Sequence, residues 1–164
     1  MLGGKDPRAF REIVVATSAG LVRLAARIMG NLADAEDVVQ DAYVRAHRAL
    51  VAGQFDGRSK LVTWLRRIVA NAAIDALRSR RRRPAATDTA PDVGWDGAAS
   101  AEARVALAEL DDWLGALPPD QRAALTLSAL EGLGNAEIAE IMGCTEGAVE
   151  QRLVRARAAL RKRS

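Results

Sequence analysis

The residues with the clearest chemistry in this sequence are two clusters of arginine and lysine. Residues 58–83 hold nine basic side chains and one acidic one, and Arg78-Ser-Arg-Arg-Arg-Arg83 places five positive charges in six residues. Residues 151–163 hold six basic side chains and no acidic one. Charges this dense repel one another unless an anion lies close by. The clusters therefore predict two contacts with a polyanion, and nucleic acid fits best; the alternative is that each is only a solvated helix face.

Residues that could support catalysis or bind a metal are scarce. One cysteine (Cys144) and one histidine (His47) can form no internal disulfide, no cysteine-rich zinc site and no Cys–His dyad. The sequence has no glycine-rich phosphate loop and no Ser/His/Asp set. We therefore expect no enzymatic activity, no metal, no cofactor and no small-molecule substrate. No apolar run approaches the ~18 residues of a membrane span, so we expect no membrane insertion.

The segment between the two basic clusters has the opposite charge. Residues 84–112 carry seven acidic side chains against Arg104, a contrast that the formal net charge of +3 for the 164 residues conceals. The part from Pro84 to about Ser100 has two prolines and no apolar period, which is typical of a linker. The sequence thus predicts one domain at residues 1–83, a flexible acidic linker at 84–99 and a second domain at 100–164.

Helical periodicity dominates on both sides of this linker. Apolar residues recur at spacings of three, four and seven, and no strand-like alternation is present. The predicted fold class is all-α, with two small helical domains. The expected helices are one ending near Gly30, one with Asp34 as N-cap, Leu61–Arg81, one ending before Pro118, Asp120–Glu131, Ala136–Met142 and Glu146–Arg161. The third is expected to pack through Leu61, Leu65, Ile68, Ala72 and Leu77.

The last two helices form the most specific local motif. Asn135 and Thr145 are placed to cap them, and Gly143 suits the left-handed end of the first. Two short helices across a three-residue turn form a helix-turn-helix. Its expected core consists of Ile138, Ala139, Ile141, Val149 and Leu153.

The second helix of this motif has the pattern of a DNA-recognition helix. Its first turns can enter a major groove while its basic end contacts phosphates. Gln151 is suited to adenine, Arg155 to guanine or phosphate, and Glu150 to the amino group of cytosine. The alternative is an αα-hairpin with an exposed basic tail, and the turn chemistry together with the charge favours DNA binding.

Three stretches, taken together, carry a family likeness. They are Asp34-Ala-Glu-Asp-Val-Val-Gln-Asp-Ala-Tyr-Val-Arg-Ala-His47, then Trp64-Leu-Arg-Arg-Ile-Val-Ala-Asn71 with Asp75 and Arg78, and finally Leu117-Pro-Pro-Asp-Gln-Arg122 running on into the helix-turn-helix. In this order they resemble the extracytoplasmic-function (ECF) sigma factors, the small promoter-specificity subunits of bacterial RNA polymerase. The likeness covers residues 7–163. It implies a non-enzymatic initiation factor with a region-2 domain, of three-helix type, followed by a region-4 domain.

The resemblance also implies protein partners. The polar face of Asp34–His47 resembles the surface that docks on the coiled coil of the largest polymerase subunit, and region 4 is expected to meet the polymerase flap. An anti-sigma factor that covers these surfaces is implied, and so is a cytoplasmic protein that such a factor can hold at the membrane. Without the resemblance, the same face would be interpreted as ordinary solvated surface. The implied polymerase-binding residues are Asp34, Glu36, Asp37, Gln40, Asp41 and Arg45.

The loop Phe55–Lys60 resembles the family's loop that captures a base flipped out of the −10 element. Unstacking a base costs a few kcal/mol, which a pocket and stacking on an aromatic ring can offset. Trp64 is expected mainly to brace this loop, because a tryptophan here is otherwise a core residue. The arginines are expected to contact the DNA backbone. The implied −10 set is Phe55, Asp56, Gly57, Arg58, Ser59, Lys60, Trp64, Arg66, Arg67, Asn71, Arg78 and Arg80.

The helix-turn-helix is implied to bind the −35 element of promoter DNA. Glu150 stands where the family often has a basic residue, so the family's base preference does not transfer. Two alternatives stay open at this point: an autonomous helix-turn-helix regulator, and a sigma-like interaction protein that does not initiate transcription. The sequence offers no dimerisation segment for the first, and an intact Phe55–Asn71 argues against the second. The implied −35 set is Thr145, Gly147, Glu150, Gln151, Arg152, Val154, Arg155 and Arg157.

Overall fold

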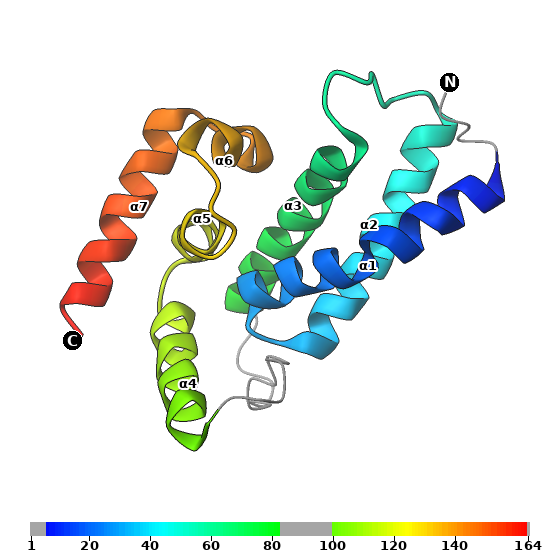
Figure 1. Cartoon of the computed structure of the whole chain (residues 1–164). Coiled ribbons are helices and arrows are strands. Elements are labelled where there is room, and N and C mark those ends of the chain that lie inside the picture. The colour runs from blue at the N-terminus through cyan, green and yellow to red at the C-terminus, as the bar shows by residue number, and fades with distance from the viewer. Residues whose placement is uncertain (1–5, 83–99, 164) are drawn as a thin grey trace.

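A computed structural model describes residues 6–82 and 100–163, and all regular structure within them is helical (Figure 1). This confirms the predicted all-α class. The predicted linker at 84–99 lies outside the described residues. The helices are α1 (Pro7–Met29), α2 (Leu32–Val51), α3 (Leu61–Arg82), α4 (Ala101–Gly115), α5 (Pro119–Ala129), α6 (Asn135–Met142) and α7 (Glu146–Arg161).

Helices α1, α2 and α3 pack against one another as a first lobe, which Figure 1 shows in blue to green. Its own core is built from small and branched apolar side chains that include Leu21, Val39, Leu65 and Val69. A polar contact also joins α1 to α2, because the hydroxyls of Thr17 and Tyr43 lie 2.6 Å apart. The lobe positions the exposed face of α2 and the loop that precedes α3.

The Tyr43 phenol makes the stability of this lobe sensitive to alkaline pH. Burial raises the pKa of Tyr43 above 10.0, and the hydrogen bond with Thr17 partly opposes that rise. The folded chain therefore holds the phenol proton more tightly than the unfolded chain. Its contribution to stability is complete below the ordinary pKa and is lost as the pH rises through the raised one.

We expect the melting temperature of the wild type to fall more steeply than that of Tyr43→Phe between about pH 9 and about pH 11, where phenols titrate. Thermal melts followed by circular dichroism measure both slopes. Thr17→Val is the matched control, since it removes the hydrogen bond and keeps the titrating phenol. Parallel slopes for the wild type and Tyr43→Phe would contradict the prediction.

Two of the predicted helix caps are wrong by one to three residues. The N-cap of α2 is Asn31, whose side chain accepts a hydrogen bond from the Asp34 N–H at 3.0 Å, so Asp34 lies in the first turn. Gly30 follows the last residue of α1 in the left-handed region at φ 72°, so only Gly30 and Asn31 lie between the helices. The N-cap of α6 is Gly134, whose N–H donates to the Glu137 carboxylate at 3.0 Å. The Glu137 side chain thus reaches back to the N–H of the N-cap, as in a capping box, and the N-cap lies one residue before the expected one.

Helices α4 to α7 form the second lobe, in which α7 packs on α5 and α6. All five predicted core residues of the helix-turn-helix are buried, which confirms that part of the prediction: Ile138, Ala139, Ile141, Val149 and Leu153. Gly143 ends α6 at φ 64°, and the Thr145 hydroxyl accepts from the Ala148 N–H at 3.1 Å to begin α7. Both of these terminal residues match the sequence prediction.

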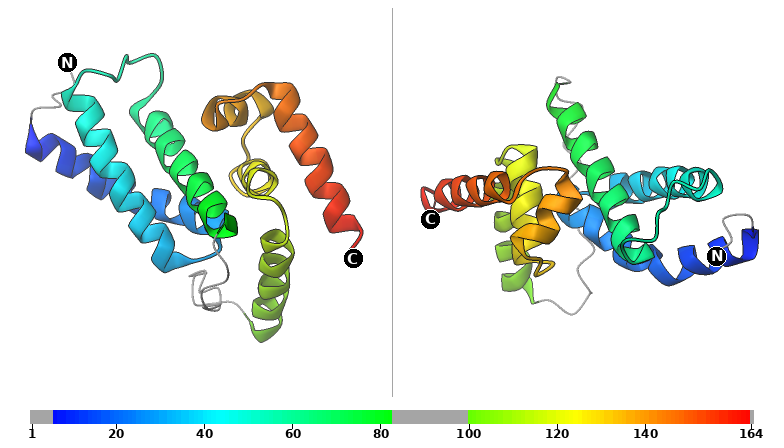
Figure 2. Two further views of the ribbon diagram at one scale, coloured as in Figure 1. Left: turned by 180° about the vertical axis from the view of Figure 1, so that it is seen from behind. Right: turned by 90° about the horizontal axis from the view of Figure 1, so that it is seen from above.

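The two lobes pack against each other, as both views in Figure 2 show. Helix α3 contacts α5 and α6, and α1 contacts α5. One apolar cluster joins residues of the first lobe, such as Ile28 and Ile74, to Leu127 and Ile138 of the second. The lobes thus share a core across residues far apart in the sequence.

This sharing changes the burial pattern of α3. Leu65 and Val69 belong to the core of the first lobe, while Ala73 and Ile74 belong to the cluster that the lobes share. Of the single stripe predicted for this helix, only Leu65 is fully buried. A helix packed between two layers buries a wider arc than one stripe, which explains the difference.

Candidate functional site

The predicted polymerase-binding residues lie along one side of α2. Their spacing of three and four residues places them on neighbouring turns of the same face. Asp34 is the exception in exposure, because it is half-buried and forms an ion pair with Arg80 of α3. The exposed members are Glu36, Asp37, Gln40, Asp41 and Arg45.

A hollow of about 320 Å³ lies beside this face, where the α1–α2 turn meets α3. Met29, Val38 and Ala76 supply its apolar lining. Asp37 and the Asp34–Arg80 pair supply its charged lining. The exposed face of α2 is therefore continuous with a shallow, partly apolar recess that a side chain of a docked protein could enter.

The loop between α2 and α3 is organised by local contacts. The Arg58 N–H donates to the Asp56 carboxylate at 3.0 Å, and Gly57 adopts φ 73°, which favours glycine. The rings of Phe55 and Trp64 pack with their centroids 5.1 Å apart and their planes tilted by 52°. Trp64 therefore contacts the loop through the Phe55 ring.

The arginines predicted to reach −10 DNA differ in availability. Arg67 is exposed and Arg66 is half-buried. Arg78 donates to Asp75 at 3.3 Å and to Asp120 of α5 at 2.5 Å. Arg80 is paired with Asp34, so both Arg78 and Arg80 are held by carboxylates of the same chain.

Helix α7 presents most of the predicted −35 set to solvent. Gly147, Glu150, Gln151, Val154, Arg155 and Arg157 are all exposed.

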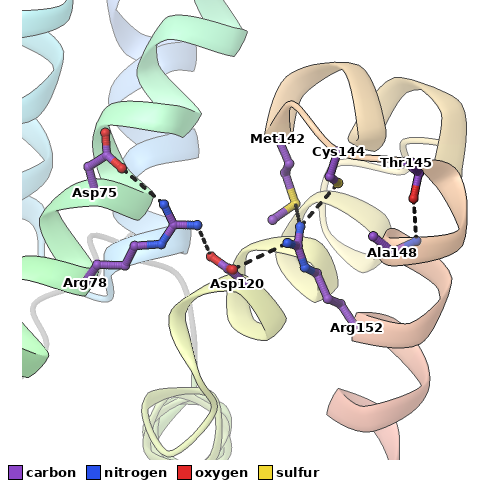
Figure 3. Close-up of polar contacts among 8 residues, drawn as sticks. All are labelled: Asp75, Arg78, Asp120, Met142, Cys144, Thr145, Ala148 and Arg152. Atoms are coloured by element: carbon purple, nitrogen blue, oxygen red, sulfur yellow. Dashed lines mark hydrogen bonds and ion pairs between the residues drawn. The ribbon is translucent and has the colours of Figure 1, made fainter.

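Arg152 is directed inward instead (Figure 3). Its Nη1 lies 3.2 Å from the Cys144 Sγ and 4.0 Å from the Met142 Sδ, and its Nη2 lies 3.5 Å from an Asp120 oxygen. Arg152 therefore ties α7 to the turn of the motif and to α5.

A buried ion pair inside the second lobe was not predicted from the sequence. Arg122 is 5 % exposed and donates to Asp111 at 2.9 Å, which joins α5 to α4. Burial lowers the pKa of Arg122, and the neighbouring Asp111 acts in the opposite direction. Gly30 lies against this pair, since a Cβ there would come within 2.5 Å of the Arg122 guanidinium. The motif Leu117–Arg122 includes Arg122, but nothing in the motif indicates that Asp111 is its partner.

Asp120 and Glu131 are the other residues that were missed. Asp120, in the first turn of α5, looks in sequence like an acid that only favours a helix N-terminus. In the structure it contacts arginines of two other helices, while Glu131 pairs with Arg27 of α1 at 2.6 Å. No sequence signal links such distant partners.

Within residues 6–82 and 100–163, no helix is both long and apolar enough to span a bilayer. Within the same residues, no three side chains of the Cys, His, Asp and Glu types are grouped so that they could hold a metal ion.

Comparison with protein families gives two matches. Residues 14–83 match the family described as Sigma-70 region 2, and residues 107–160 match Sigma-70, region 4. The chain is 38% identical over 169 residues to the RNA polymerase sigma-H factor of Pseudomonas aeruginosa, covering 96% of this chain and 86% of the relative. It is 36% identical over 171 residues to the ECF RNA polymerase sigma-E factor of Escherichia coli K12, covering 94% and 86%.

Solved structures with a similar fold include two complexes. One is CnrH in complex with the cytosolic domain of CnrY, with a TM-score of 0.66, 31% identity, and coverage of 96% of this chain and 88% of that one. The other is the sigma factor RpoE of Bartonella quintana in complex with the anti-sigma factor NepR, with a TM-score of 0.66, 25% identity, and coverage of 94% and 96%. Both likenesses extend over nearly the whole chain.

Proposed function

The chain belongs to the ECF sigma factors of RNA polymerase, which are not enzymes and direct promoter-specific transcription initiation, and we propose which function each of its lobes has. Residues 1–83 bind core polymerase and the −10 element, residues 100–164 bind the −35 element, and residues 84–99 tether them. The observation that carries the −35 assignment is the exposed face of α7, which follows a capped helix-turn-helix.

Docking on core polymerase is assigned to the exposed face of α2. Glu36, Asp37 and Asp41 make this face predominantly acidic, with Gln40 and Arg45 beside them. Such a face favours a basic partner surface and raises the association rate through long-range attraction. The partner surface we propose is the coiled coil of the largest polymerase subunit. The flap of the polymerase is the corresponding partner of the second lobe.

Strand opening is assigned to the loop Phe55–Lys60. Its ring contact with Trp64 and its left-handed Gly57 give it a defined shape before DNA arrives. A preformed loop favours capture of a flipped base because less ordering is needed on binding. Arg66, Arg67 and Asn71 lie on the same helix as Trp64 and complete the −10 surface.

We also propose an anti-sigma partner and a cytoplasmic location. Two similar chains support the partner, since one was solved with the anti-sigma factor NepR and the other with the cytosolic domain of CnrY. Such a factor would cover the α2 face and, if anchored, hold this chain at the membrane. The match to region 2 over residues 14–83 disfavours an autonomous helix-turn-helix regulator, which needs no such domain.

The test is run-off transcription with purified chain and core polymerase on a promoter library, omitting each component in turn. We expect promoter-specific product only when both are present. The double substitution Asp37→Lys with Asp41→Lys should lower the product by about tenfold at limiting chain, because it reverses charge at the docking face.

Glu12→Lys with Glu140→Lys is the matched control, since both glutamates are exposed and lie outside the proposed sites. A co-purification assay with core polymerase measures docking directly. Equal product from the Asp37→Lys, Asp41→Lys variant and from the control would show that the docking site lies elsewhere. Product that lacks promoter specificity would contradict the division of work between the lobes.

A further inference from the structure

The carboxylate of Asp120 lies between the lobes and contacts an arginine with each of its oxygens (Figure 3). Its Oδ1 accepts from Arg78 of α3 at 2.5 Å, and its Oδ2 lies 3.5 Å from Arg152 of α7. We propose that Asp120 is an intramolecular latch that takes the place of DNA phosphates, holds the lobes closed and weakens DNA binding by the free chain. The inference rests on the proposed function, because Arg78 and Arg152 belong to the sets assigned to the −10 and −35 elements.

The closed arrangement is too short to contact both promoter elements. Their names place them about 25 base pairs apart, which is roughly 85 Å of duplex at about 34 Å per turn. Helix α3 has 22 residues and α7 has 16, so they are about 33 and 24 Å long. Even end to end, these two helices would not span the distance, and Asp120 ties both of them to α5. The lobes must therefore separate before both elements can be bound.

The ion pairs of Asp120 are partly buried, and they are also exposed enough for a DNA phosphate to replace the carboxylate. The side chains of Arg78, Asp120 and Arg152 are 45%, 31% and 26% exposed. Partial burial reduces screening of these pairs by salt. At the same time, a phosphate can approach the guanidinium groups and replace the carboxylate with a charge-assisted contact of the same kind.

Two further contacts close the same interface. Arg27 of α1 pairs with Glu131, just beyond α5, at 2.6 Å. The shared apolar cluster, which includes Ile28, Ile74 and Leu127, lies between the lobes. The ion pairs thus add directional contacts to a common apolar surface, and Asp120 is the one among them whose partners are assigned to DNA.

The test uses the full chain without polymerase. A fluorescent mixed-sequence duplex of about 30 base pairs reports phosphate-dominated binding through its anisotropy. We expect Asp120→Asn to bind this duplex about fivefold more tightly than the wild type. The slope of log K against log[salt] should also be steeper by about one. In the wild type, DNA binding frees the Asp120 carboxylate, which takes up a cation from solution, whereas the asparagine takes up none. Small-angle scattering of Asp120→Asn should show a radius of gyration larger than the ~15 Å expected for a compact chain of this length.

Asp112→Asn is the matched control, because it removes the same charge from an exposed residue of the same lobe. Glu131→Gln is a second opening variant, which breaks the Arg27 pair without touching Asp120 or helix α5. We expect it to tighten duplex binding by about twofold, since it shifts the population towards the open state.

The latch is overturned if Asp120→Asn matches Asp112→Asn in both affinity and radius of gyration. If circular dichroism shows that Asp120→Asn is unfolded, Glu131→Gln decides the matter, and wild-type behaviour of that variant overturns the proposal. If the wild-type chain gives promoter-specific run-off product but Asp120→Asn leaves the duplex affinity and the radius of gyration unchanged, the latch is refuted and the proposed function stands. An open Asp120→Asn chain without promoter-specific run-off supports the latch and refutes the proposed function.

Discussion

Replacing Asp111 with alanine is expected to destabilise the second lobe by about 3 kcal/mol, because it leaves a buried guanidinium without its counter-charge. Arg122 is 5 % exposed, and its Nε has no hydrogen-bond partner among the described residues. Burial lowers the Arg122 pKa, and Asp111 is the contact that opposes this effect. An arginine does not lose its proton at working pH, so the unpaired charge stays.

Urea denaturation, followed by circular dichroism, measures the loss. Asp112→Ala is the control, because its carboxylate is exposed on the same helix and should cost less than about 0.5 kcal/mol. The double variant Asp111→Ala with Arg122→Met should recover most of the lost stability, since it removes both charges and keeps an apolar side chain of similar length. A cost for Asp111→Ala as small as that of the control would show that the pair does not hold α4 on α5.

Replacing Phe55 and Trp64 together with alanine is expected to slow open-complex formation by about 100-fold, given that stacking contributes about 1–3 kcal/mol per base. The rings pack on each other at 5.1 Å, so their removal takes away the shape of the loop as well as an aromatic surface. Docking on polymerase should not change, because the exposed face of α2 lies outside this loop.

Permanganate footprinting on duplex promoter DNA measures strand opening, and a premelted bubble template separates opening from other steps. We expect the bubble to restore most of the activity of the Phe55→Ala, Trp64→Ala variant, since no base has to be unstacked. Val62→Ala is the control on the same helix, where the side chain is 47% exposed and lies outside the proposed site. An equal loss on duplex and bubble would show that the aromatic pair acts in folding or docking rather than in opening.

Local features of this fold follow from neighbouring residues, and these were predictable. Helix α7 spans Glu146–Arg161 as expected, because Thr145 caps its start and the apolar period continues to its last turn. The left-handed Gly143 and the small core of the motif were predicted for the same reason. The cap of α2 was misplaced because Asn31 and Asp34 are both good caps, and only the position of Gly30 selects between them.

Features that depend on residues distant in sequence were not predictable. The second buried face of α3 exists because α5 and α6 pack on it, and no pattern within Leu61–Arg82 predicts that these two helices are its neighbours. The same holds for Arg122, whose burial requires α4 and the turn at Gly30 to approach α5 together. A spacing rule describes one helix at a time and does not identify its partners.

In the basic clusters, the sequence determines where the positive charges lie along the chain, and the tertiary structure determines which of them are available for binding. The sequence alone determined that positive charge gathers near the end of α3 and along α7, since charge is a property of residue type. Only the tertiary structure decided which of those charges are available. Arg78 and Arg152 meet at Asp120 because three helices converge there, whereas Arg67, Arg155 and Arg157 stay exposed. Availability depends on distances between residues far apart in the chain, and the packing of the lobes sets those distances.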